Sequence, residues 1–512
     1  LKAFVKEKNI PHMLFAGPAG TGKCVVSSTP ILTSTGVKPV KDVNVNDFVV
    51  SLLPNGKFGW RRVVGKISRK CETVKIVTKS GNSVTVSLEH PFLVLRKGLP
   101  VWKKASNLRC GDFVATPEIL ESSLNLSMDF SKVEDLWVKL KKCRKVEVYK
   151  LFTDSRQKVL KALWNHKLSI KEISELTDLK YQTVQYALSR LVSSGFVRRD
   201  GGVYTIIKKF VITTILPYES SISMEEIDKI STKQNGSFSS WIKPFGNSEE
   251  FYEWLGYLLS EGRVEEGRIT FFNMDQKLLG RFAKLTRTVF GLNPLILKDR
   301  VLIRKSGTIK NILEELFNVY TGKRKSYHIK VPSILFIEKK RKIASFIRAY
   351  FDGDGHFSPR KNEIEICSNS REVLIGIKNL LLRFGIRSFI YKKKNSYKLL
   401  ITGVRNIRKF AREIGSLKVD FKIQDVKENS NLSIPFASDA VKYIMKRLSI
   451  KYADLFDNEK KLEYLFERNR GSPRKVKEVY RRLVKLSRKR ILLLLELLGE
   501  LEDILSIDAE KL

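Results

Sequence analysis

The order of hydrophobic and polar positions divides the chain into stretches of different character. From Cys24 to about Thr116, short runs such as FVVSLL and NSVTVSL alternate in polarity and are separated by Gly, Pro and Asn. A period of two between the Gly and Pro punctuation predicts strands, so residues 24–125 are expected to form an all-β domain. The chain after this domain is expected to form an insertion at 126–245, a repeated αβ domain at 246–425 and a basic helical region at 426–512.

Within the insertion, residues 155–206 contain three helical periods and then a basic hairpin with Gly201-Gly202 at its tip. This pattern resembles a winged helix-turn-helix, with Ile170–Thr177 as the supporting helix and Tyr181–Leu191 as the recognition helix. The resemblance implies DNA contact through the outward side chains of that helix and of the wing. These side chains are Tyr181, Gln182, Thr183, Gln185, Arg198 and Arg199. A small helical domain that contacts protein is the alternative interpretation.

The domain at 246–425 contains an internal repeat. WLGYLLSEG at 254–262 and IRAYFDGDG at 347–355 each end in an acid followed by Gly, and a strand and a second helix follow each of them. The two acids, Glu261 and Asp354, stand 93 residues apart. The repeated pattern predicts two units that pack with pseudo-two-fold symmetry, with both acids at the base of the interface.

Two carboxylates held close together repel each other unless a positive group lies between them. A hard divalent cation such as Mg²⁺ satisfies this requirement, and it can activate water for attack on a phosphate. The strands of the repeats also place cations on exposed faces, among them Lys392, Lys393 and Lys394, as a surface that binds nucleic acid requires. An acid and a Gly after a single helix form a common helix end, and the matched repeat is what makes the pattern specific.

The repeat resembles the LAGLIDADG homing endonuclease family over roughly residues 250–415. The resemblance implies that each repeat is an αββαββα unit. The resemblance implies magnesium-dependent cleavage of both strands of DNA at a long recognition site, with Glu261 and Asp354 as catalytic, metal-binding acids. Members of this family often carry a lysine near a Lys-x-Ile/Val-Pro stretch between the two helices. HIKVPSILF offers Lys330 for this role, one position away from the usual spacing. An ordinary phosphate contact is the alternative role for Lys330.

Composition agrees with a polyanionic partner. Lys and Arg number 95 against 54 Asp and Glu, which gives a formal net charge of +41 and favours nucleic acid, here double-stranded DNA. The five Cys form no CxxC pair, which favours a reducing cytoplasm over a disulfide framework. No uncharged apolar run is long enough for a membrane span, so no membrane partner is expected.

The first residues begin a nucleotide-binding motif that is not completed. FAGPAGTGK fits the loop that holds nucleotide phosphates, but the next residue is Cys24 where a Ser or Thr that binds Mg²⁺ should stand. The expected phosphate-binding residues are Gly17, Gly20, Thr21, Gly22 and Lys23.

An inserted, self-excising element explains this interruption. CVVSSTPILTSTGVKPVKDV resembles the first block of an intein, and GNSVTVSLEHPFLVL resembles the second. The core of the second block is usually Thr-x-x-His, and here Ser87 replaces the Thr while His90 is the usual His. The resemblance implies protein self-splicing that starts when the Cys24 thiol attacks the Lys23 carbonyl. His90 would protonate the leaving nitrogen, with Ser87 hydrogen-bonding beside it. A satisfied strand histidine and a small buried cysteine are the alternatives, and no C-terminal splicing motif follows residue 425.

Residues 1–23 resemble the small subunit of archaeal replication factor C, a clamp-loader ATPase. For the spliced host, the resemblance implies binding of ATP and Mg²⁺, and partners among the sliding clamp and the other clamp-loader subunits. The whole chain is therefore expected to be a cytoplasmic, multidomain α+β protein: a short P-loop fragment, an all-β splicing domain of the Hint type, a winged helix-turn-helix, an endonuclease and a helical region. The alternatives are an intein that binds DNA without cleaving it, and a winged-helix regulator that does not splice.

Overall fold

The computed structural model describes residues 24–52, 58–79, 81–96, 99–115, 128–152, 154–234, 237–322, 324–394 and 396–423, together with short pieces between 442 and 486. The expected phosphate-binding residues 17–23 and most of the expected helical region 426–512 lie outside the described residues. One short helix of that region, α12 (Tyr452–Phe456), is described.

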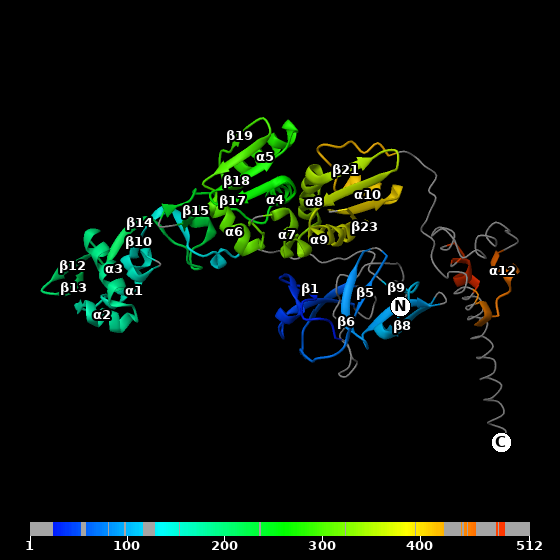
Figure 1. The fold of residues 1–512 in the computed structure, drawn as a ribbon, viewed down its shortest axis with the longest axis horizontal. Coiled ribbons are helices and arrows are strands. Elements are labelled where there is room, and N and C mark those ends of the chain that lie inside the picture. Colours follow the sequence, from blue (N-terminus) through cyan, green and yellow to red (C-terminus); the bar gives the residue numbers. More distant parts are fainter. Residues whose placement is uncertain are drawn as a thin grey trace, which may run out of the picture.

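Strands form through most of the described part of 24–115, as the alternating pattern predicts, and they make up the β-rich unit (Figure 1). A four-stranded sheet has the order β2-β1-β3-β4, β5 pairs with β6, and a third sheet has the order β8-β7-β9. Their bounds are β1 (Pro30–Thr33), β2 (Gly36–Pro39), β3 (Phe48–Leu52), β4 (Phe58–Arg62), β5 (Thr73–Val77), β6 (Ser83–Ser87), β7 (Pro91–Arg96), β8 (Leu99–Lys104) and β9 (Phe113–Val114).

The next segment contains a sheet into which a helical unit is inserted. The sheet has the order β14-β10-β15-β16, and the inserted unit lies between β10 and β14 at one end of the molecule in Figure 1. The sheet strands are β10 (Leu136–Glu147), β14 (Phe210–Pro217), β15 (Ile227–Gln234) and β16 (Ser237–Phe238). The inserted unit contains α1 (Ser155–Ala162), β11 (Leu168–Ser169), α2 (Ile170–Thr177), α3 (Tyr181–Ser193), β12 (Val197–Asp200) and β13 (Val203–Ile206).

Local sequence explains the boundaries of the inserted unit. Ser169 and Glu172 form a reciprocal capping box at the start of α2, which satisfies amide groups that the helix leaves unpaired. The helix ends at Asp178, whose φ of 55° lies in the left-handed region. Gly201 and Gly202 both have positive φ, as a two-residue hairpin turn between β12 and β13 requires.

The predicted repeat is present as two units with the same order of elements and the same sheet topology, β17-β18-β20-β19 and β21-β22-β24-β23. The first unit contains α4 (Glu249–Glu261), β17 (Gly262–Glu265), β18 (Arg268–Phe272), α5 (Gln276–Phe290), β19 (Leu295–Ile296), β20 (Arg300–Arg304) and α6 (Gly307–Phe317). The second contains α8 (Lys340–Asp354), β21 (Gly355–Ser358), β22 (Glu363–Ser368), α9 (Arg371–Leu381), β23 (Phe389–Lys393), β24 (Ser396–Thr402) and α10 (Val404–Glu413). Between them lies α7 (Lys325–His328).

The expected boundary near residue 245 does not separate two cores. One continuous apolar core includes residues from Phe130 to Ile414, and these come from both the β14-β10-β15-β16 sheet and the repeats. The Ser- and Asn-rich stretch before residue 245 forms part of β15 and β16, and the Thr232 amide donates to Thr308 Oγ1 over 3.1 Å. The β14-β10-β15-β16 sheet therefore extends the first repeat, and a separate core is found in the inserted helical unit.

In the described part of the chain, no helix combines the length and the apolar character that crossing a bilayer requires.

Candidate functional site

The helices α4 and α8 form the contact between the two repeats and lie side by side in Figure 1. A methyl group on Gly256 would lie 2.4 Å from the carbonyl oxygen of Phe346 and 2.8 Å from the Cβ of Ala349. The two helices therefore approach closely at Gly256 and Ala349, and the contact leaves no room for a side chain at position 256.

The same contact brings the two acids together at the ends of the helices. A methyl group on Gly353 would lie 2.3 Å from Ser260 Oγ and 3.2 Å from Glu261 Cγ, so Glu261 packs against the residue that precedes Asp354. Gly262 and Gly355 follow the two acids, and their φ values of −91° and −102° are ordinary. These two glycines instead avoid clashes with the preceding turn of their own helices.

A buried ionic cluster, which the sequence analysis did not identify, fixes the relative position of the two helices. The buried carboxylate of Glu253 on α4 accepts two hydrogen bonds from Arg281, over 2.7 and 2.6 Å. It also accepts one from Arg348 on α8 over 3.2 Å. A buried carboxylate requires such compensation, and here one partner comes from each repeat. The signal available in the sequence for this cluster was an acid, Glu253, in the first repeated helix together with Arg281 and Arg348 in two other predicted helices.

The two site acids have perturbed protonation. Burial and the neighbouring charge of Glu261 raise the pKa of Asp354 to about 7, against opposing effects of Tyr350 and Lys325. Burial also raises the pKa of Glu261, although Lys418 and Lys325 favour its charged form. The two carboxylates, which the repeat predicts to lie close together, are therefore near enough for the charge of Glu261 to raise the pKa of Asp354.

A lysine that the sequence analysis did not single out, Lys325, lies close enough to the two acids to interact with their charges. Lys330 is exposed, five residues further along the chain. The Lys325 ammonium group donates to the carbonyl oxygens of Leu258 and Gly262, the latter over 2.6 Å. Burial lowers the pKa of Lys325 to about 7, against the favourable charges of Asp354 and Glu261. The Lys-Val-Pro stretch therefore lies in the same connecting segment as Lys325, and the role expected for Lys330 stays a prediction.

A second lysine, Lys418, occupies the matching place in the other repeat. Lys325 and Lys418 stand 93 residues apart, the same separation as the two acids. Lys418 is exposed, but its positive charge favours the ionised form of Glu261 and so opposes the rise in the pKa of that carboxyl. The fully buried Asp352 on α8 accepts hydrogen bonds from Ser416 Oγ and from the Leu417 amide, so it fixes the segment that presents Lys418.

The carboxylates of Glu261 and Asp354 are the kind of ligand that Mg²⁺ binds in proteins. Mg²⁺ is usually held by one or two carboxylates together with waters and substrate phosphates. Within the described residues, no group of three or more His, Cys, Asp and Glu side chains could hold a metal ion. Glu261 and Asp354 supply two carboxylates, so water and phosphate oxygens would have to complete a site that these two residues held.

A separate constellation surrounds Cys24 in the β-rich unit. The Cys24 amide donates to Ser87 Oγ over 3.4 Å, and the Ser87 amide donates to the Cys24 carbonyl over 3.0 Å. The next turn brings the buried His90, whose amide donates to the Ser87 carbonyl over 3.0 Å. Arg69, which the sequence analysis did not single out, donates from Nε to Cys24 Sγ over 3.1 Å. The structure thus brings Ser87 into contact with Cys24 and adds a cation.

The residues expected to contact DNA lie on two surfaces. On α3, Tyr181, Gln182 and Gln185 are exposed and Thr183 is half-buried. Arg198 and Arg199 are exposed on β12, and Lys392, Lys393 and Lys394 are exposed at the end of β23. Tyr186 on α3 is a further exposed side chain, and the Arg190 guanidinium lies 5.4 Å from its ring centroid. Helical spacing from Gln182 could have identified it.

A family model described as a LAGLIDADG-like domain matches residues 341–415. The matched range covers nearly all of α8 and the rest of the second repeat. Curated relatives include two replication factor C small subunits. One, from Methanocaldococcus jannaschii, is 24% identical over 88% of this chain and 19% of its own length, and one from Thermococcus kodakarensis is 23% identical over 95% and 44%. The predicted resemblance to that archaeal protein interrupted by a LAGLIDADG element is therefore confirmed.

Another relative carries a different name. A probable translation initiation factor IF-2 from Methanocaldococcus jannaschii is 27% identical over 91% of this chain and 39% of its own length. The chain thus spans less than half the length of these curated relatives. A solved structure of mesophilic variants of the homing endonuclease I-DmoI is 16% identical, with a TM-score of 0.25, over 33% of this chain and 96% of that one.

Proposed function

We propose that the two repeats form a site-specific endonuclease that cleaves both strands of DNA in the presence of Mg²⁺. The observation that carries this proposal is the meeting of Glu261 and Asp354 at the ends of two helices that approach closely at Gly256 and Gly353. Two acids with raised pKa at the interface of two basic repeats are arranged for chemistry on a polyanion.

The residues of the chain divide the work. Glu261 and Asp354, when ionised, would hold the cation, whose chemistry there is the activation of water and the stabilisation of charge on phosphate. Lys325 has a pKa of about 7 and can therefore exchange a proton with a nucleophile or a leaving oxygen at neutral pH. Lys418 would interact with the phosphate on the other side of the pair, from the segment that Asp352 fixes.

The exposed cations outside this site would position the DNA. Lys392, Lys393 and Lys394 extend from the sheet of the second repeat, where phosphate contacts add affinity without reading sequence. The inserted unit, which we interpret as a winged helix-turn-helix, would place Gln182 and Gln185 against base edges. Arg198 and Arg199 on the β12–β13 hairpin would contact flanking phosphates.

Cleavage of the uninterrupted host gene tests the nuclease. A plasmid that contains the joined coding sequence on both sides of the insertion should become linear in the presence of Mg²⁺, and EDTA should abolish this. The same plasmid with the insertion present should remain intact, because the insertion splits the recognition site. Binding without cleavage at any Mg²⁺ concentration would instead favour the alternative of a DNA-binding element that has lost its activity.

A second function is favoured by the contacts of Cys24. We infer that residues 24–115 form part of a Hint-type splicing domain, in which the thiol of Cys24 attacks the carbonyl of residue 23. The carbon–sulfur bond forms as the carbon–nitrogen bond breaks, and the nitrogen takes up a proton through His90. Ser87 Oγ lies 3.4 Å from that nitrogen and can orient it.

A thiol-cleavage assay tests the splicing step separately from DNA. Dithiothreitol should release the 23 residues before Cys24, which mass spectrometry detects, and Cys24→Ala should abolish the release. An uncleaved mass for the unmodified chain would contradict splicing chemistry and favour a winged-helix regulator.

For the host, we propose a clamp-loader ATPase of the cytoplasm that binds ATP and Mg²⁺ through Gly17, Gly20, Thr21, Gly22 and Lys23. Its partners would be the sliding clamp and the other clamp-loader subunits.

A further inference from the structure

The contact between Arg69 and Cys24 is not explained by the residues of the splicing motifs. Arg69 lies between β4 and β5 in a segment without regular structure, and its Nε donates to Cys24 Sγ over 3.1 Å. A guanidinium group stays charged at any physiological pH and has no acceptor function. A sulfur that accepts from it is therefore stabilised most strongly in its negatively charged form.

Two further observations support a chemical role for this contact. The hydrogen bond to Cys24 and the charge of Cys24 raise the pKa of Arg69, with a smaller contribution from Cys71, so the contact favours the charged guanidinium. The backbone of Cys24 is fixed independently, by its reciprocal hydrogen bonds with Ser87. Arg69 is therefore not needed to hold the backbone of Cys24, and its contact falls on the atom that reacts.

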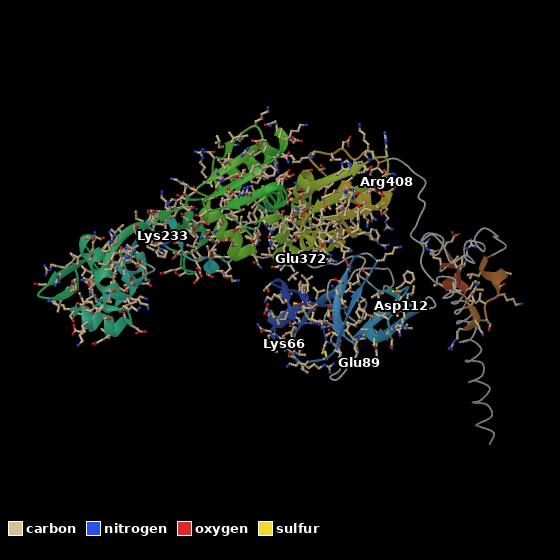
Figure 2. All side chains as sticks on the ribbon, in the orientation of Figure 1. Lys66, Glu89, Asp112, Lys233, Glu372 and Arg408 are labelled. Atoms are coloured by element: carbon tan, nitrogen blue, oxygen red, sulfur yellow. The ribbon has the colours of Figure 1, made fainter. Side chains whose placement is uncertain are left out.

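The contact lies on an open side of the β-rich unit. Arg69 is exposed, and Lys66 of the same segment lies on the side that faces away from the repeats (Figure 2). A charge in this position is hydrated, so the effect on the thiol is expected to be moderate and not that of a buried ion pair. A moderate increase in thiolate is still useful, because the thiolate is the nucleophile and an ordinary thiol is mostly protonated at pH 7.

We propose that Arg69 is a catalytic residue of the first splicing step, which holds the Cys24 sulfur as a thiolate for attack on the carbonyl of residue 23. This inference rests on the splicing function proposed above. The thiol proton leaves before the attack, the carbon–sulfur bond forms, the carbon–nitrogen bond breaks, and one proton is delivered to the Cys24 nitrogen. Protons balance across the step, and no oxidant or reductant is consumed.

The test separates the state of the sulfur from the reaction. In the full chain carrying Cys71→Ser, the rate at which iodoacetamide alkylates Cys24 at pH 7 is followed by peptide mass spectrometry, with the exposed Cys110 as an internal control. Arg69→Ala should slow alkylation of Cys24 about severalfold relative to Cys110, because the thiolate is the form that reacts and the variant removes the cation beside it. Arg69→Lys should retain part of the rate. Lys70→Ala, which removes a neighbouring charge and leaves the contact in place, should retain all of it.

Dithiothreitol cleavage of the same variants completes the test. Slower release from Arg69→Ala, partial rescue by Arg69→Lys and normal release from Lys70→Ala would support the proposal. Equal release from the parent chain and from Arg69→Ala would overturn the role of Arg69 and leave splicing intact. No release from the parent chain would overturn splicing itself and the role of Arg69 with it. Unchanged DNA cleavage by Arg69→Ala would show that this variant folds.

Discussion

The two repeats share one order of elements, yet they differ at several positions near the two acids. Gly256 on α4 corresponds to Ala349 on α8, and the buried Leu259 corresponds to the buried Asp352. The first repeat is followed by Lys325, whose ammonium group is held by two carbonyl oxygens, whereas the exposed Lys418 follows the second. A repeated fold can therefore hold two unequal half-sites, because equal backbones do not imply equal burial.

This difference has a consequence for cleavage of two DNA strands. A site that is symmetric in chemistry would cut both strands at equal rates, and an unequal one would favour a nicked intermediate. Variants of the acids and of the lysines separate the two half-sites by activity, and variants of Asp354 and Gly256 test their packing by stability.

The acids should produce the largest effect. Asp354→Asn and Glu261→Gln each remove a ligand of the proposed cation, so each should reduce cleavage by about a hundredfold or more, a loss typical of essential catalytic groups. Gel analysis of a supercoiled plasmid measures both nicking and linearisation. If either variant retained full double-strand cleavage, the acid pair would not be the active site.

The two lysines should differ from each other. Lys325→Met removes a held ammonium group and should slow cleavage by roughly a hundredfold, whereas Lys418→Met removes an exposed one and should slow it by about tenfold. The ratio of nicked to linear plasmid, measured for both variants, reports on the two strands separately. Equal losses would show that burial does not distinguish the half-sites. Lys330→Met is the matched control, and it should cleave at close to the normal rate.

The raised pKa of Asp354 predicts a pH dependence. Because the pKa of Asp354 is about 7 when folded and near 4 when unfolded, the folded protein binds the extra proton between these values. Without metal, stability should therefore fall as pH rises from about 4 to 7, by up to about 1.4 kcal/mol per pH unit. Asp354→Asn should flatten this slope in urea unfolding, and an unchanged slope would contradict the assignment. Cleavage, which needs the ionised form, should rise through pH 7.

The helix contact should give the smallest effect. Gly256→Ala places a methyl group against the Phe346 carbonyl and should destabilise the protein by about 1–3 kcal/mol, as overpacking does. Gly280→Ala on α5 is the matched control, because its methyl group meets no atom within 4 Å. It should stabilise by up to about 1 kcal/mol through helix propensity. Urea unfolding measures both, and equal effects would show that α4 and α8 do not pack as closely as described.

The sequence by itself determined the elements that depend on local pattern. The repeated helices, their terminal acids, the strands of the β-rich unit and the three helices with a hairpin follow from periodicity, capping residues and turn glycines, which act over a few residues. The pairing of Glu261 with Asp354 was also predictable, because a matched repeat implies its own symmetry.

The tertiary structure alone decided which side chains complete the sites. Lys325 near the two acids, the ionic cluster of Glu253, and Arg69 beside Cys24 each depend on contacts between residues that are distant in the chain. The joining of the β14-β10-β15-β16 sheet to the core of the repeats is of the same kind. Burial and distance set the pKa of a carboxylate or an ammonium group, and neither quantity exists until the chain has folded.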